Sequence, residues 1–196
     1  RKEAEARQAE LRLEMEQQRK LEVERQKAAL ERQHSEALRQ ASASLRALET
    51  YRRLGQRLTT LRLKTYIQGF RLTKTEFDEY ERIRSECRAE MARSGEDAEG
   101  WWVVAKASEM RGELGKAIEA YDKGLAKNPD HGMCLLDKAR LLIELSLSTL
   151  GKPEDRQEAL HLLERGGKTR AVPEIELDLA RANVLAMTSP DEAVRR

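Results

Sequence analysis

The chain of 196 residues is poor in the residues that break helices and in those that build β-sheets. It has only four prolines, and aromatic residues make up 4% of it. This composition argues against a β-sandwich and against a Rossmann-type sheet. Charged residues, in contrast, make up 37% of the chain, which is typical of long helices that face solvent. We therefore expect an all-α protein.

Cysteines and long apolar runs are also scarce. Cys87 and Cys134 are too few for a disulfide framework and are consistent with a reducing compartment, which favours the cytoplasm. No run of 18 apolar residues occurs, so the sequence predicts no membrane span, and it shows no signal peptide. Because the chain begins with Arg1 rather than Met and stops at Arg196 within a helical pattern, we interpret it as a fragment. An upstream anchor, and with it an envelope location, stays open.

The residues that catalysis or metal binding would need are not grouped. Three scattered histidines give no nucleophile, base and acid set. His131 and Cys134 have the spacing of half a zinc site, but no second pair is near, and structural zinc takes four ligands. Residues 167–169 resemble the end of a phosphate-binding loop, yet Leu162 stands where that loop needs glycine. The sequence therefore predicts no enzyme, no cofactor and no metal.

The net charge of +2 hides an uneven distribution. Residues 1–72 hold 17 Lys and Arg and 10 acids, a net charge of +7. Residues 73–196 hold 20 Lys and Arg and 25 acids, a net charge of −5. We expect the basic part to attract the acidic part, in the same chain or in a second one.

The first part, residues 1–72, is predicted to be one long helix. Residues 1–54 contain neither proline nor glycine, and nearly all are good helix formers. Farther along, apolar residues recur at steps of three and four, which predicts a continuous apolar stripe that another surface covers. The stripe consists of Leu38, Ala41, Leu45, Leu48, Tyr51, Leu54, Leu58 and Leu61.

Three arrangements of this helix compete. The stripe can form a coiled-coil oligomer, it can dock on the rest of its own chain, or residues 1–35 can form an isolated charged helix. We predict the coiled coil, because one helix cannot bury the stripe on itself. The residues expected between chains are Leu38, Leu45, Leu48, Leu54, Leu58 and Leu61.

Residues 73–97 are predicted to form a connecting helix that caps the part that follows. Thr73 and Glu76 have the spacing of a capping box, in which each side chain bonds the backbone of the other residue. Ser94 to Asp97 end the helix. Helical arrays need such a cap, because their ends would otherwise expose apolar surface.

Residues 98–131 have the pattern of a helical hairpin. A large aromatic residue lies on the first helix, small residues let two helices approach closely, and a glycine lies in the turn. A proline then ends the unit, since it cannot continue a helix interior. The residues that carry this pattern are Trp101, Gly112, Leu114, Ala117, Tyr121, Gly124 and Pro129.

These spacings resemble those of a tetratricopeptide repeat, a helix–turn–helix unit of about 34 residues. The resemblance covers residues 98–196, with repeats at 98–131 and 132–173 and a partial one at 174–196. Ser189 and Pro190 are predicted to open one more helix. The full expected fold is therefore a long N-terminal helix followed by a short tetratricopeptide solenoid.

The resemblance implies a function in protein binding, because the first helices of such repeats line a concave groove that takes a partner peptide or helix. The groove residues it implies here are Glu99, Trp102, Lys106, Glu109, Met110, Met133, Leu136, Arg140 and Ile143. A second interpretation is that Trp102 and Met110 only pack under the helix at residues 73–94.

We therefore expect a non-enzymatic scaffold for protein–protein interactions, in which the long helix oligomerises or acts as a spacer. An alternative rests on the basic segment 46–71, which has seven Lys and Arg against the single acid Glu49 and could bind nucleic acid or an anionic membrane surface. The identity of the partner cannot be inferred.

Overall fold

The computed structural model describes residues 2–67, 72–146, 152–168 and 174–186. In these ranges the chain forms seven α-helices and no strand. The all-α class and the long N-terminal helix predicted from the sequence are confirmed. Arg71 and the predicted helix at Ser189 and Pro190 lie outside the described residues.

Helix α1 extends from Lys2 to Ile67 and has 66 residues. Contacts divide the chain within this helix, into Arg1–Arg46 and Ala47–Arg196. We call the first unit the arm and the second the helical domain. This division lies earlier than the predicted boundaries at residues 72 and 97, because the last third of α1 supplies core residues to the helical domain.

The arm has no core of its own. Every apolar side chain that the structure describes between Met15 and Leu45 is exposed. Its helix has local support, since Lys20 forms an ion pair of 2.9 Å with Glu16, one turn before it. Strong helix formers without proline or glycine explain why the segment is helical in the absence of tertiary packing.

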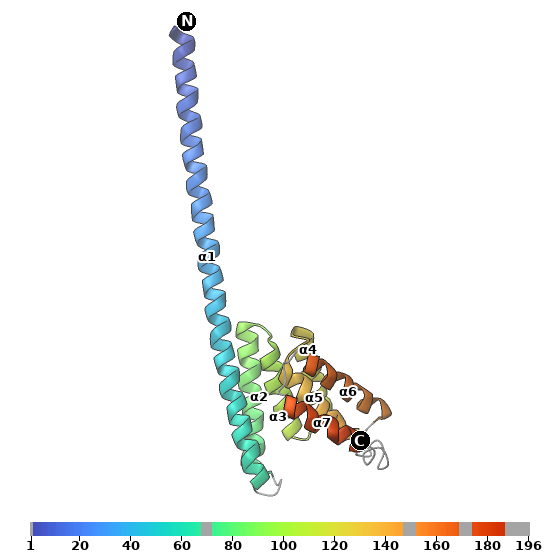
Figure 1. Ribbon diagram of the computed structural model, residues 1–196. Coiled ribbons are helices and arrows are strands. Elements are labelled where there is room, and N and C mark those ends of the chain that lie inside the picture. Colours follow the sequence, from blue (N-terminus) through green and yellow to red (C-terminus); the bar gives the residue numbers. More distant parts are fainter. Residues whose placement is uncertain (1, 68–71, 147–151, 169–173, 187–196) are drawn as a thin grey trace. The chain divides into compact units, whose positions relative to one another are not determined.

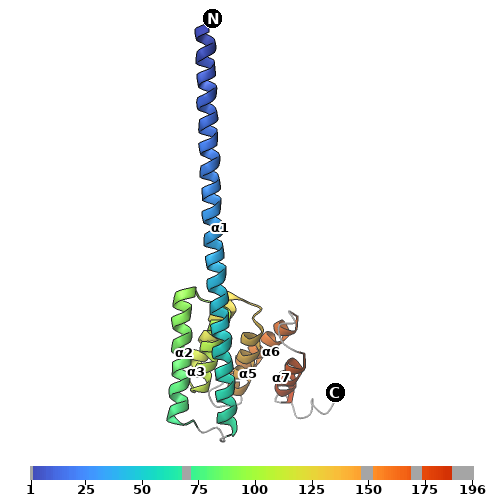
Figure 2. The same cartoon turned by 90° about the vertical axis from the view of Figure 1, so that its left-hand side faces the viewer.

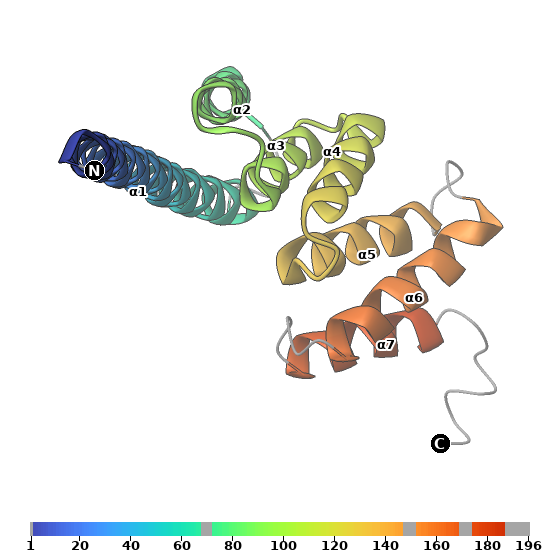
Figure 3. The same ribbon diagram turned by 90° about the horizontal axis from the view of Figure 1, so that it is seen from above.

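The helical domain continues with six helices that pack on one another in chain order (Figures 1 and 3). α3 also contacts α5, and α5 contacts α7, so alternate helices lie on one side. α6 continues through Gly166 and Gly167 to Lys168. The helices are α2 (Lys74–Ser94), α3 (Ala98–Met110), α4 (Leu114–Lys127), α5 (Gly132–Ser146), α6 (Pro153–Lys168) and α7 (Glu174–Ala186).

The predicted capping box begins α2. The backbone N–H of Glu76 donates to Thr73 Oγ1 at 3.3 Å, and the backbone N–H of Thr73 donates to Glu76 Oε2 at 2.9 Å. Both bonds satisfy groups that a helix start leaves without partners. The bond from the Thr73 backbone is the first cause of the lowered pKa of Glu76.

Small residues allow the close approach of α3, α4 and α5, as the sequence predicted. Ala117 and Tyr121 are fully buried between the helices. A Cβ atom on Gly124 would lie 2.8 Å from Cys134 Sγ and 3.4 Å from the carbonyl oxygen of Ala98. Since real Cβ atoms do not approach sulfur so closely, only glycine fits between α3 and α5 at this point.

The turn between α3 and α4 needs its glycine for a different reason. Gly112 has a φ of 75°, a left-handed conformation that side chains disfavour. At the other end of the hairpin, the Lys123 ammonium lies 4.9 Å from the centroid of the Trp101 ring and so joins α3 to α4. The helix–turn–helix unit predicted over 98–131 is thus present as a hairpin of two helices.

The segment 47–67 of α1 packs against α2 and α3 within its own domain (Figure 2). Tyr51, Leu54 and Leu58 are 1%, 0% and 2% exposed. Arg57 forms ion pairs with Glu79 and Glu86 of α2. The expected attraction between the basic and acidic parts of the chain therefore occurs within one molecule.

The prediction of a single apolar stripe from Leu38 to Leu61 is wrong. Leu38 and Leu45 are exposed, whereas Leu54 and Leu58 belong to the core of the helical domain. The reason is geometric: nine residues of α-helix turn through about 900°, which puts Leu45 and Leu54 on opposite faces. Each step of three residues falls short of a full turn, so several such steps in a row move the apolar residues around the helix.

Candidate partner-binding groove

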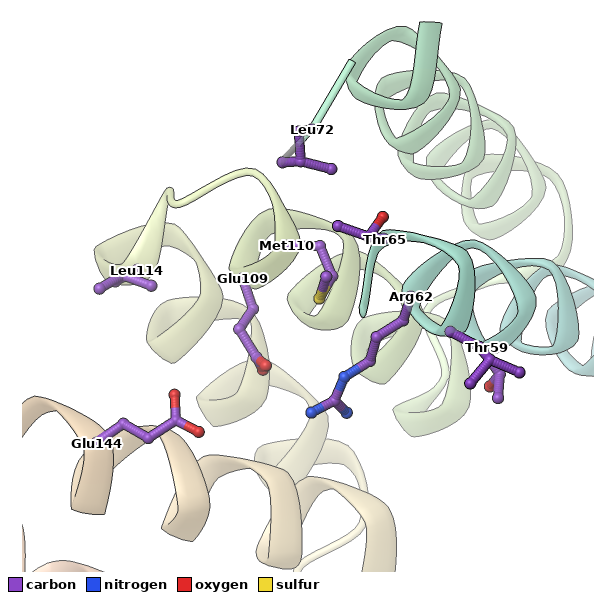
Figure 4. A pocket seen from close by; sticks show the side chains of 9 residues that line it. Thr59, Arg62, Thr65, Leu72, Glu109, Met110, Leu114 and Glu144 are labelled. Atoms are coloured by element: carbon purple, nitrogen blue, oxygen red, sulfur yellow. The ribbon is translucent and has the colours of Figure 1, made fainter. Parts of the chain in front are cut away.

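Three helices surround a pocket of about 600 Å³ in the helical domain (Figure 4). α1 supplies one wall, and α3 and α5 supply the others, together with residues just before α2 and at the start of α4. A cavity of this size fits one or two large side chains of a ligand. The lining residues are Thr59, Arg62, Leu63, Thr65, Leu72, Glu109, Met110, Leu114 and Glu144.

A smaller cavity of about 120 Å³ shares Thr59, Arg62 and Met110 with the first. It extends the hollow surface along α3 and α5 to Met133 and Arg140. We call the two cavities together the groove. The groove contains six of the predicted partner-binding residues, which are Trp102, Lys106, Glu109, Met110, Met133 and Arg140.

Trp102 lies at the base of the groove and is 8% exposed. A Cβ atom on Gly55 would lie 2.8 Å from Cζ3 of this ring, so the backbone of α1 packs directly against the indole. Trp102 Nε1 donates a hydrogen bond of 2.8 Å to Asp137 Oδ2. Trp102 therefore packs under α1, not under the helix at 73–94, and it presents little surface to a partner.

A buried polar network continues from this indole. Lys106 Nζ lies 3.2 Å from Asp137 Oδ1 and donates to Glu109 Oε1 at 2.9 Å. Tyr121 donates its hydroxyl hydrogen to the other oxygen of Glu109 at 2.8 Å. Burial, followed by the charge of Glu109, raises the pKa of Tyr121. The polar atoms of these groups are hydrogen-bonded or paired with one another. The network therefore holds α3, α4 and α5 together and is not itself a ligand site.

The other predicted groove residues differ in accessibility. Leu136 and Ile143 are buried in the second core cluster, with α6 and α7. Met133 is 44% exposed and can contact a partner. Arg140 is half-buried and pairs with Glu176 of α7 at 3.2 Å. Glu99 lies away from both cavities and bonds His131 Nε2 at 2.9 Å.

Besides Met133, the exposed apolar part of the groove includes two residues that the sequence did not indicate. Leu63 is 59% exposed and Leu72 is 37% exposed, although both line the larger cavity. Met110 and Leu114 lie below them and are half-buried. An exposed apolar hollow with polar walls is typical of a binding site.

Two charges face the larger cavity without an ion pair. Figure 4 shows Arg62 of α1 extending toward the carboxylates of Glu109 and Glu144. Within the described ranges, Arg62 and Glu144 form no ion pair with each other or with another residue. Partial loss of solvent and then the charge of Glu109 raise the pKa of Glu144, while Lys106, Arg62 and Arg140 oppose the rise.

The segment 46–71 is less basic in the structure than in the sequence. Arg57 is paired with two carboxylates of α2, and Lys64 Nζ lies 3.4 Å from Glu76 Oε1. Arg52 and Arg53 remain exposed. Neutralised cations contribute little to the binding of a polyanion.

His131 and Cys134 are engaged in the fold. The backbone N–H of Cys134 donates to His131 Nδ1 at 3.3 Å, so the ring helps to cap the start of α5. Cys134 is fully buried, and burial raises the pKa of its thiol. In the part of the chain that the structure describes, no three His, Cys, Asp or Glu side chains are grouped as metal ligands would be.

Comparison with family models, with curated proteins and with solved structures gave no match. Among the described helices, none combines the length and the apolar character needed to cross a membrane. In the ranges that the structure describes, the chain is an all-α protein with a long N-terminal helix and a domain of packed helices.

Proposed function

We propose that this chain is a non-enzymatic scaffold whose groove binds a segment of a partner protein. One observation carries the proposal. The hollow surface between α1, α3 and α5 combines exposed Leu63, Leu72 and Met133 with a rigid, hydrogen-bonded base. Such surfaces bind partners well, because little order has to be gained on binding.

A tetratricopeptide-like organisation supports this proposal. In such arrays the first helices of successive hairpins share one side, and here α3 contacts α5 and α5 contacts α7. The segment 47–67 of α1 and α2 then form the first hairpin, which caps the array. On this interpretation, the groove is the concave face of three stacked hairpins.

We further propose that the arm oligomerises the chain or serves as a spacer. On an α-helix, Val23, Leu30, Leu38 and Leu45 fall within about 80° of one another. All four are exposed. This thin apolar line suits a helix–helix contact between two chains, although it has only one large residue for every two turns. Without such a contact, the arm spans about 65 Å as a charged helix.

Photo-crosslinking tests the groove directly. A benzoylphenylalanine at position 63 or 133 would lie in the groove, and the same residue at Lys116 or Glu164 would lie on exposed helix surface outside it. We expect a discrete crosslinked protein in the native cell from positions 63 and 133 only. Equal crosslinking from all four positions would contradict a binding site in the groove.

Binding of nucleic acid or anionic lipid through the segment 46–71 is the alternative function. Its remaining support is three exposed residues, Arg52, Arg53 and Arg62. A steep loss of oligonucleotide or vesicle binding with added salt, reduced by Arg52→Gln and Arg53→Gln, would favour it. With Arg57 and Lys64 neutralised by α2, we expect only weak binding of either kind.

A further inference from the structure

One line of residues on helix α1, which we call the α1 line, is symmetric about His34. Counted from His34 in either direction, the line steps by four, three, four, three and four residues, and it ends at Glu16 and at Arg52. All its positions fall within about 80° of one another on an α-helix, and none of their side chains is buried. Two copies of the α1 line that run in opposite directions therefore face each other at every step.

Antiparallel pairing about His34 brings apolar residues opposite apolar residues. Leu30 faces Leu38 of the second copy, and Val23 faces Leu45. All four side chains are exposed in a single chain. Because a two-fold symmetric pair contains each contact twice, four apolar contacts are removed from water.

The lysines of the α1 line favour the antiparallel orientation. In a parallel pair in register, Lys20 and Lys27 would each face their own copy, and the like charges would repel each other. In the antiparallel pair Lys20 faces Leu48, and Lys27 faces Ala41. The aliphatic stems of the lysines can then pack on these residues while the ammonium groups reach water.

The two ends of the α1 line favour the same orientation. Antiparallel pairing places Glu16 opposite Arg52, so opposite charges meet twice in each dimer. Both side chains are exposed, although the Lys20 ammonium of the same chain also lies 2.9 Å from Glu16 Oε1. Parallel pairing would instead place each of these charges opposite its own copy. Charge complementarity thus distinguishes the two orientations.

We propose that two copies of this chain pair through the α1 line, in antiparallel orientation and centred on His34. This inference rests on the proposed role of the arm in oligomerisation, since it names the occupant of the exposed apolar line. The two helical domains then follow opposite ends of the paired segment. One dimer therefore carries two grooves and can bind two partner segments at once.

Disulfide crosslinking of the full chain tests this pairing. The variants are Leu30→Cys, Leu38→Cys and the double variant with both changes, at side chains that are exposed in a single chain. The matched control is Arg32→Cys, which is exposed on the opposite side of the helix. The natural Cys87 and Cys134 are buried and contribute little background.

We expect the double variant to form a covalent dimer at least about tenfold faster than either single variant or the control, because position 30 of one copy then faces position 38 of the other. In each single variant the two equal positions lie about 12 Å apart along the helix axis, whereas a disulfide joins Cα atoms less than about 7 Å apart. Crosslinking of both single variants would show a parallel pair and overturn the inference, as would equal crosslinking of the control.

The mass of the natural chain in solution gives a second readout. Sedimentation equilibrium should show a dimer that Leu30→Asp with Leu38→Asp converts to a monomer. A natural chain that stays monomeric up to millimolar concentration would overturn this inference and leave the arm as a spacer. The function of the groove is tested separately by photo-crosslinking, so its failure is distinguishable from failure of the pairing.

Discussion

The two parts of helix α1 have opposite roles. In the arm, Leu38 and Leu45 are exposed and support no core. Only a few residues later, Tyr51, Leu54 and Leu58 are among the most deeply buried side chains of the protein. Good helix formers alone therefore make a helix, whereas the phase of the apolar residues decides whether the helix joins a domain.

The largest expected contrast comes from the same change on the two faces of α1. Leu54→Ala should lower the free energy of unfolding of the helical domain by about 2–5 kcal/mol, because it leaves a cavity in the core. Leu45→Ala should change it by less than about 0.5 kcal/mol, because this side chain is exposed. Urea unfolding measured by circular dichroism compares the two variants. Equal losses would contradict the division of α1.

A second contrast concerns two glycines of α4. Gly124→Ala should destabilise the domain by about 1–3 kcal/mol, since the new Cβ would collide with Cys134 Sγ. Gly115→Ala meets nothing within 4 Å and should stabilise the helix by up to about 1 kcal/mol. The melting temperatures of both variants, compared with that of the natural chain, test this contrast. A stabilised Gly124→Ala variant would show that α3, α4 and α5 are not closely packed there.

A third prediction concerns acid stability of the helical domain. Glu113 accepts a 2.6 Å hydrogen bond from Arg84, which is the first cause of lowering the pKa of Glu113 from 4.5 to about 2. A lowered pKa stabilises the fold above about pH 5, and this stabilisation is lost as the pH falls toward 2. Glu113→Gln should therefore cost about 1–2 kcal/mol at pH 7 and less at pH 2.

The control for this prediction is Glu119→Gln. Glu119 also forms an ion pair, with Lys123 at 2.7 Å, but both side chains are exposed. Unfolding curves between pH 7 and pH 2 should show a shallower pH dependence for Glu113→Gln than for the natural chain and little change for the control. If the natural chain and both variants showed the same pH dependence, Glu113 would not be the cause of the acid sensitivity.

Local features of the fold could be predicted from the sequence, and contacts between distant segments could not. The capping box at Thr73 and the close packing at Ala117 and Gly124 depend on a few neighbouring residues, and both are present. The prediction of one stripe through Leu45 and Leu54 was wrong, because a count of steps of three and four ignores the rotation that accumulates along the helix.

The groove was predicted only in part, for a related reason. The residues on α3 and α5 were those that the tetratricopeptide resemblance implies, but the wall supplied by α1 requires a long-range contact. Gly55 was the signal, since a glycine within a long helix often marks a close approach. Here its missing side chain makes room for Trp102. Periodicity along α1 alone could not reveal this.

Hydrogen exchange along α1, followed by mass spectrometry at two protein concentrations, tests the division of this helix most directly. The account predicts slow exchange of the amides between Tyr51 and Leu61 at both concentrations, because their side chains are buried within one chain. Amides between Val23 and Leu45 should exchange fast at low concentration and become protected only if the arm self-associates. Protection of 51–61 that appears only at high concentration would contradict the account, because burial would then occur between chains.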